Sequence, residues 1–123
     1  MPQPTIAIVG ASNDRRKFGN RAVRAYARQG WDVYPVNPHE TLIEGRRVYP
    51  SVGDIQVSQL DRVSLYVPPE IGLQLVEEIA RKPPREFWLN PGADSPELIA
   101  RAEARGLNII VACSIVDIGE SPI

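Results

Sequence analysis

The stretch IAIVGASNDRRKFGN, residues 6–20, changes character at its centre. Its apolar first half, which begins at Thr5 and ends at Val9, is continuous rather than alternating, which is typical of a parallel strand that is buried on both faces. A turn of small residues begins at Gly10, and three basic residues in a row follow it. A buried strand that leads through a tight turn toward a helix predicts a βαβ unit and so decides the class of fold.

Further apolar segments alternate between strand and helix patterns. Strands are expected in WDVYPVNP, DRVSLYVPP, EFWLNPG and LNIIVAC, residues 31–38, 61–69, 86–92 and 107–113. Helices are expected over residues 19–27, 72–80 and 96–105. Pro69 is expected in the first turn of the second helix, and Ser95 is expected to cap the third. Gly30 and Gly106 are expected to end the first and the third helix. The alternation predicts an α/β fold of three layers, an open parallel sheet of about five strands with helices on both faces. Between residues 37 and 61 the pattern weakens and predicts a short hairpin or a strand, together with a single helical turn.

Length and composition limit the classes of function. A chain of 123 residues is expected to form one domain, residues 1–123. No apolar run reaches the roughly 20 residues that cross a bilayer, and no signal peptide is recognised, so we expect a cytoplasmic protein that does not bind membranes. One cysteine, Cys113, and one histidine, His39, give no basis for a disulfide framework or a metal site. A formal net charge of -1 argues against nucleic-acid binding.

Basic residues gather directly after the first turn. Six of the 14 lysines and arginines lie there: Arg15, Arg16, Lys17, Arg21, Arg24 and Arg28. A solvated helix face is the ordinary interpretation of such a cluster. Its position after a strand and a turn favours an anion site instead, because the N–H groups at a helix N-terminus attract anions and the Ser12 hydroxyl adds a donor.

Parallel sheets bind ligands beyond the carboxyl ends of their strands, near the point where the strand order reverses. We therefore expect the site in four segments at one edge of the domain, residues 10–20, 37–40, 67–70 and 90–93. The first segment departs from the dinucleotide pattern G-x-G-x-x-G, because Ser12 and Arg15 replace two glycines. The second strand is followed by Asn37 and Pro38 instead of the acid that binds an NAD ribose. NAD is therefore disfavoured, but it stays open as an alternative.

The stretches IVGASND, YPVNP, EGRRVYPSVGDI, VPPE and WLNPGA together resemble the coenzyme A-binding domain family, a small Rossmann-like domain. The same domain is found at the front of the succinyl-CoA synthetase alpha subunit and of ADP-forming acyl-CoA synthetases. The resemblance extends from about residue 5 to about residue 113 and implies coenzyme A as the ligand. It implies a diphosphate site made by Gly10, Ala11, Ser12 and Asn13, with Arg15, Arg16 and Lys17 near the phosphates. The adenosine would be flanked by Val36, Asn37, Pro38 and His39. The nucleotide would pack on Val67 and Pro68, and the pantetheine would lie along Leu89, Asn90 and Pro91.

Catalytic patterns are missing from the sequence. No serine has the setting of a nucleophile elbow, and no histidine and carboxylate can be paired from their spacing. Synthetase subunits add a second domain with a phosphorylated histidine, and His39 is in the wrong place to replace it, so we expect binding without ligase activity. Cys113 is expected to be a buried apolar residue; a mixed disulfide with coenzyme A is the alternative.

Three functional hypotheses follow. The leading hypothesis is a non-catalytic module that binds coenzyme A or an acyl-CoA and acts as a carrier, a sensor or a detached subunit, with its protein partner unidentified. The second is an NAD(P)-binding regulatory domain. The third is a protein-interaction subunit whose ligand pocket is vestigial.

Overall fold

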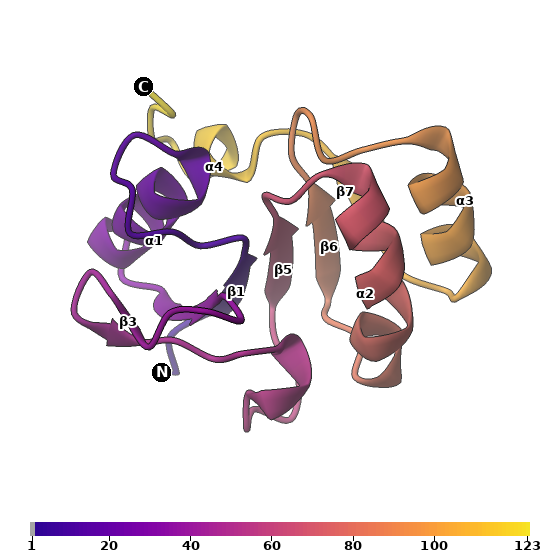
Figure 1. Cartoon of the computed structure of the whole chain (residues 1–123), viewed down its shortest axis with the longest axis horizontal. Helices are drawn as coiled ribbons and strands as arrows, with labels where there is room; N and C mark the ends of the chain where they lie inside the picture. The colour runs from indigo at the N-terminus through magenta and orange to yellow at the C-terminus, as the bar shows by residue number, and fades with distance from the viewer. Residues whose placement is uncertain (1) are drawn as a thin grey trace.

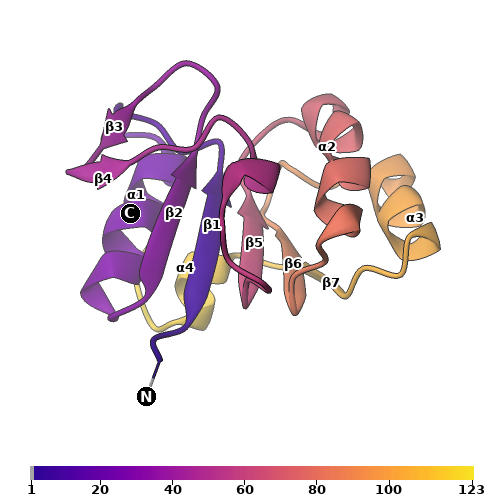
Figure 2. The same cartoon turned by 90° about the horizontal axis from the view of Figure 1, so that it is seen from below.

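The computed structural model describes residues 2–123 and contains a parallel sheet of five strands. The strands lie in the order β2-β1-β5-β6-β7. Their bounds are Thr5–Val9 for β1, Asp32–Val36 for β2, Arg62–Leu65 for β5, Glu86–Leu89 for β6 and Ile109–Val111 for β7. Figures 1 and 2 show helices on both faces of this sheet. The predicted Rossmann-like α/β fold is therefore confirmed.

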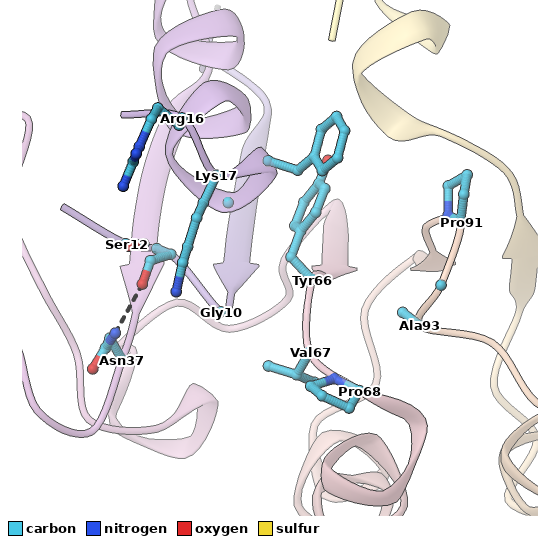
Figure 3. Close-up of a pocket in the computed structure, with 14 residues that line it drawn as sticks. Gly10, Ser12, Arg16, Lys17, Asn37, Tyr66, Val67, Pro68, Pro91 and Ala93 are labelled. Carbon is cyan, nitrogen blue, oxygen red and sulfur yellow. Dashed lines mark hydrogen bonds between the residues drawn. The ribbon is translucent and has the colours of Figure 1, made fainter. Parts of the chain in front are cut away.

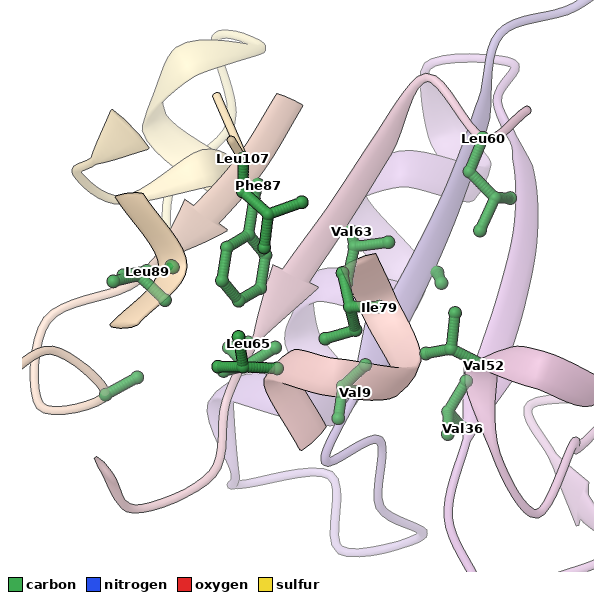
Figure 4. Packing of buried hydrophobic residues seen from close by; sticks show 14 of the residues in the cluster. Val9, Val36, Val52, Leu60, Val63, Leu65, Ile79, Phe87, Leu89 and Leu107 are labelled. Atoms are coloured by element: carbon green, nitrogen blue, oxygen red, sulfur yellow. The ribbon is translucent and has the colours of Figure 1, made fainter. Parts of the chain in front are cut away.

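Two apolar layers form because successive residues of each buried strand point to opposite faces. Ile6 and Ile8 of β1 pack against α1 (Phe18–Arg28) and α4 (Ser114–Asp117). Ala7 and Val9 pack on the other face, against α2 (Pro69–Arg81) and α3 (Pro96–Ala104), as Figure 4 shows for Val9 and its neighbours. The continuous apolar pattern of β1 is thus explained by burial on both sides.

The predicted helix boundaries agree with the structure. Pro69 is the first residue of α2, and the side chain of Ser95 accepts a hydrogen bond of 3.1 Å from the backbone N–H of Leu98 in α3. Gly30 and Gly106 follow α1 and α3 with φ angles of +83° and +76°, the left-handed conformation that glycine adopts at low cost.

The segment between β2 and β5 contains the predicted hairpin and helical turn. The hairpin pairs β3 (Leu42–Ile43) with β4 (Arg46–Arg47), and the 3-10 turn η1 covers Val52–Asp54. The chain crosses from β2 at one edge to β5 on the far side of β1, so the strand order reverses between β1 and β5. That reversal defines where a ligand is expected.

The C-terminal segment differs from the expectation. Strands β2, β5, β6 and β7 all end two to four residues before their predicted ends, and α4, which the sequence pattern does not predict, follows β7. Strand β7 stops early because the backbone N–H of Ser114 donates to the buried side chain of Asn90, at 2.9 Å, and so turns the chain across the sheet end. No helix in residues 2–123 is long and apolar enough to cross a membrane.

Candidate ligand-binding site

A cavity of about 710 Å³ lies at the carboxyl ends of the strands, at the reversal of strand order between β1 and β5. All four predicted segments contribute to its wall (Figure 3). Of the sixteen predicted site residues, nine line it: Gly10, Ala11, Ser12, Arg16, Lys17, Asn37, Val67, Pro68 and Pro91. The prediction that the four segments meet at one edge is therefore confirmed.

The turn after β1 is packed too closely for any side chain at two positions. Gly10 has a φ of +91°, and a Cβ there would lie 2.7 Å from the carbonyl oxygen of Tyr66. A Cβ on Gly19, in the first turn of α1, would collide with the carbonyl oxygen of Gly10. These two glycines let the loop touch both β5 and α1, so the N-terminus of α1 reaches the cavity.

The first turn of α1 presents the positive end of the helix dipole to the cavity. Lys17 is the cap residue, and Phe18 and Gly19 also line the wall. Within residues 2–123, no side chain caps this helix end and no acid lies in its first turn. The backbone N–H groups of a first helical turn have no intrahelical partner. Here the N–H groups of Asn20 and Arg21 donate to the carbonyl oxygen of Lys17, so those of Phe18 and Gly19 are the ones that are available to an anion.

Two cationic side chains, Arg16 and Lys17, stand on the same part of the wall, and none of its described residues is acidic. Arg16 makes a bidentate pair with Asp14, at 3.0 Å for both Nε–Oδ1 and Nη2–Oδ2. The hydrogen bonds from Arg16 lower the pKa of Asp14 to about 2, so Asp14 stays ionised at neutral pH. Ser12 accepts a hydrogen bond of 3.0 Å from the backbone N–H of Asp14, which orders the loop.

The second loop is tied to the first through Asn37. Its Nδ2 donates to the carbonyl oxygen of Ala11 at 2.9 Å, and its Oδ1 accepts from the backbone N–H of His39 at 2.7 Å (Figure 3 labels Asn37). Val36 is buried in the core. Pro38 and His39 are exposed and lie outside the cavity wall.

Asn13 and Arg15 also lie off the cavity wall and connect the first loop to the β3–β4 hairpin. Asn13 donates to Glu40 at 2.7 Å and to the carbonyl oxygen of Leu42 at 3.1 Å. Arg15 pairs with Glu44 at 3.4 Å. In this structure both side chains therefore fix the loop, and neither faces the cavity.

Leu89 and Asn90 are buried beneath the cavity. The Nδ2 atom of Asn90 donates to Ser64 Oγ and to the carbonyl oxygen of Leu65, both at 2.8 Å, while its Oδ1 accepts from Ser114. The amide that the sequence suggested for a ligand contact is thus fully engaged inside the protein. Of this segment only Pro91 among the predicted residues reaches the wall.

Five wall residues were not named individually from the sequence: Phe18, Gly19, Tyr66, Gly92 and Ala93. Four of them lie within the predicted segments 10–20 and 90–93, and only Tyr66 lies outside the predicted segments. Tyr66 is the most informative, because it directly precedes the predicted Val67 and Pro68 and lies between the two ends of the cavity. Its hydroxyl lies 3.0 Å from Ser114 Oγ, and burial raises its pKa well above the usual range, so it remains a neutral phenol. In the sequence, the position of Tyr66 between the end of a predicted strand and two prolines could have indicated that it belongs to the site.

Cys113 lies outside the cavity wall. It is half-buried and packs against the core on the α1 side of the sheet. Cys113 thus packs against the core as a small apolar residue would, but it is only half-buried and not buried as expected.

The cavity is polar at one end and apolar at the other. Figure 3 shows Ser12, Lys17 and Asn37 at one side, and Pro91 and Ala93 at the far side. The wall is therefore suited to an elongated ligand with an anionic part and a less polar part.

Comparisons with known proteins agree with this geometry. The family model described as CoA binding domain matches residues 4–118. The alpha subunit of ADP-forming acetate–CoA ligase II from Pyrococcus furiosus is 36% identical over 78 residues, which are 63% of this chain and 17% of that protein. The aligned residues thus span less than a fifth of that curated relative.

Solved structures of similar size are also close to this fold. A conserved hypothetical protein from Pyrococcus furiosus has 32% identity and a TM-score of 0.84, covering 93% of this chain and 98% of its own. A hypothetical protein from Pyrococcus horikoshii has 32% identity and a TM-score of 0.84, covering 92% of this chain and 79% of its own. The fold therefore also occurs as a small chain of similar length.

Proposed function

This chain belongs to the CoA binding domain family, and from that premise we propose that its cavity binds coenzyme A or an acyl-CoA. The diphosphate lies at the first loop and the N-terminus of α1, and the pantetheine runs toward the far end of the cavity. The observation that carries the proposal is the phosphate end, where an uncapped helix N-terminus joins Arg16 and Lys17 on one wall.

Charge supports the assignment of the phosphate end. The described part of this wall carries two cationic side chains and no carboxylate. A diphosphate there gains from the helix dipole and from charge-assisted hydrogen bonds. Arg16 is the adaptable group, because its side chain is 89% exposed and turns from Asp14 toward a phosphate at little cost in buried surface.

Shape supports the rest of the assignment. Cavities that bind small molecules and cofactors span roughly 300–1,000 Å³, and this one has about 710 Å³. Val67 and Pro68 give an apolar surface for the nucleotide, beside Asn37 and the second loop. Pro91, with Gly92 and Ala93, lines the path of the pantetheine. Asn90 acts from below by holding this segment in place.

We further propose that the protein does not catalyse a reaction and acts as a carrier, a sensor or a detached subunit. The support is the composition of the wall: its described residues include no histidine, cysteine or carboxylate, the groups that most often serve as base or nucleophile. The curated relative is a ligase subunit, and this chain matches only 17% of it. A detached subunit would rely on a protein partner to supply the catalytic residues that the rest of such a ligase contains.

Isothermal titration in reducing buffer at low salt, with coenzyme A, desulfo-coenzyme A, NAD and NADP in parallel, tests the proposal. We expect saturable binding of coenzyme A that persists in the desulfo analogue, because recognition lies in the nucleotide and pantetheine. Binding of NAD or NADP alone would instead make this a nicotinamide nucleotide site. Binding of none of the four would leave a vestigial pocket and overturn the proposal.

A further inference from the structure

A second hollow, of about 350 Å³, lies along α1 and is lined at one end by residues of the loop that follows β1. Residues 121–123 lie beside α1, where the carbonyl oxygen of Pro122 accepts a hydrogen bond from Arg21, and Ser121 and Ile123 line the hollow. The other lining residues are all arginines: Arg15, Arg16, Arg21, Arg24 and Arg28. We call this the arginine hollow.

The charges of the arginine hollow are only partly balanced. Three carboxylates pair with three of its arginines: Asp14 with Arg16 at 3.0 Å, Glu44 with Arg15 at 3.4 Å, and Glu120 with Arg28 at 2.8 Å. Among the side chains, five guanidinium groups against three carboxylates leave an excess of two positive charges. The excess belongs to the two remaining arginines.

Arg21 and Arg24 contact neutral oxygen atoms. Arg21 donates to the carbonyl oxygen of Pro122 at 2.6 Å. Arg24 donates to Asn20 Oδ1 and to the carbonyl oxygen of Arg15, both at 2.8 Å. Neither forms a salt bridge with a described residue, and both are half-buried, so their charges are less hydrated than those of a free surface arginine. A guanidinium group has more N–H donors than these contacts use.

The spacing brings these charges together. Arg21, Arg24 and Arg28 are three and four residues apart on α1, so they share one face of the helix. Like charges at this spacing destabilise a helix slightly. A bound anion reduces that repulsion. Its binding is also favoured because the three guanidinium groups are already oriented by their hydrogen bonds to Pro122, Asn20 and Glu120.

We propose that the arginine hollow is a second anion site, which binds a phosphate-bearing small molecule. Arginine forks match the oxygen atoms of phosphate groups and bind them in bidentate fashion. The volume lies near the lower limit of small-molecule sites, roughly 300 Å³, which favours a compact ligand over an extended acidic peptide. Arg16 lines both this hollow and the main cavity, so the two sites are neighbours.

The test follows the arginine Nε–Hε signals by NMR in protein saturated with coenzyme A, while inorganic diphosphate is added at constant ionic strength. Inorganic phosphate, ATP and a hexaglutamate peptide are titrated in parallel to separate the sources of negative charge. We expect saturable shifts for Arg21, Arg24 and Arg28 with diphosphate or ATP. In R21Q/R24Q we expect the affinity measured at Arg28 to fall about tenfold, because charge-assisted hydrogen bonds are lost.

R81Q/R101Q is the matched control, because it removes the same charge from exposed positions on α2 and α3. It should leave the diphosphate affinity within about twofold, since exposed charges act weakly at a distance in salt. The single variant Arg28→Gln, read at Arg21 and Arg24, replaces the double variant if the latter does not fold.

Three results would overturn the inference: shifts that grow linearly without saturation, equal weakening in the control, or saturable binding of hexaglutamate without binding of diphosphate. The last result would assign the hollow to an acidic protein segment. The inference is independent of the proposed function. If coenzyme A itself does not bind, the same signals are followed without it, and the backbone amides of residues 10–17 report the main cavity separately.

Discussion

Ser12→Asp should weaken coenzyme A binding without unfolding the protein. Ser12 lines the proposed phosphate end of the cavity, and its hydroxyl accepts a hydrogen bond of 3.0 Å from the backbone N–H of Asp14. Aspartate accepts the same bond from the residue two positions on, so the turn is expected to survive. The variant therefore adds one negative charge to the loop and keeps the loop conformation.

The size of the effect follows from Coulomb's law. A carboxylate about 5 Å from one phosphate charge is repelled by about 1–3 kcal/mol, for effective dielectric constants of about 80 down to 20. That range corresponds to a roughly 5- to 150-fold rise in Kd. Ser12→Asn is the matched control, because asparagine has nearly the same shape and makes the same turn without the charge. The Ser12→Asn variant should lose less than about threefold in affinity for coenzyme A.

Isothermal titration at low and high salt, with thermal unfolding of each variant, measures this prediction. The difference in Kd between Ser12→Asp and Ser12→Asn should shrink at high salt, because the repulsion is partly screened. If both variants bind as the unmodified protein does, the first loop does not hold the diphosphate. If both lose the same affinity, shape rather than charge explains the role of Ser12.

Three other substitutions test separate parts of the site. Replacing Arg16 and Lys17 by alanine should flatten the salt dependence of coenzyme A affinity, and an unaltered slope would mean that the attraction arises elsewhere. Gly19→Ala should lower the free energy of unfolding by about 1–3 kcal/mol and weaken coenzyme A binding, because the new Cβ displaces the first loop. Gly53→Ala is the control and should change neither quantity, because its new Cβ would lie 3.6 Å from the nearest atom. Asn90→Ala should lower the free energy of unfolding by about 2–4 kcal/mol, by leaving buried partners unpaired, and change Kd less than about threefold. A large loss of affinity in a stable Asn90→Ala protein would give Asn90 a direct ligand contact.

The architecture could be predicted because it depends on periodicity and on helix ends. Continuous apolar segments identified the buried strands, while Ser95, Pro69 and Gly106 marked helix boundaries through local backbone chemistry. Helix α4 was missed because it has only four residues and its position depends on Ser114, whose partner Asn90 is 24 residues away in the sequence. Long-range side-chain contacts of this kind leave no periodic pattern.

The location of the cavity that forms the candidate site could also be predicted, since the carboxyl ends of parallel strands share one edge. Which side chains face the cavity could not. In the first loop Ser12 reaches the wall while Asn13 turns to the hairpin, and no rule of spacing separates these neighbours. Arg15 and Arg16 show the same division, because Glu44 holds the first away and Asp14 leaves the second on the wall.

Hydrogen bonds of Asn90 connect the far end of the cavity to the C-terminal segment. Its amide joins β5, through Ser64 and Leu65, to the backbone of Ser114. Ser114 in turn contacts the hydroxyl of Tyr66 on the cavity wall. Because a buried polar network is stable only when every member is paired, a ligand that moves Tyr66 must either keep this network intact or move α4 with it. The cavity wall is thereby linked to the segment that leads to residues 121–123 and to the arginine hollow.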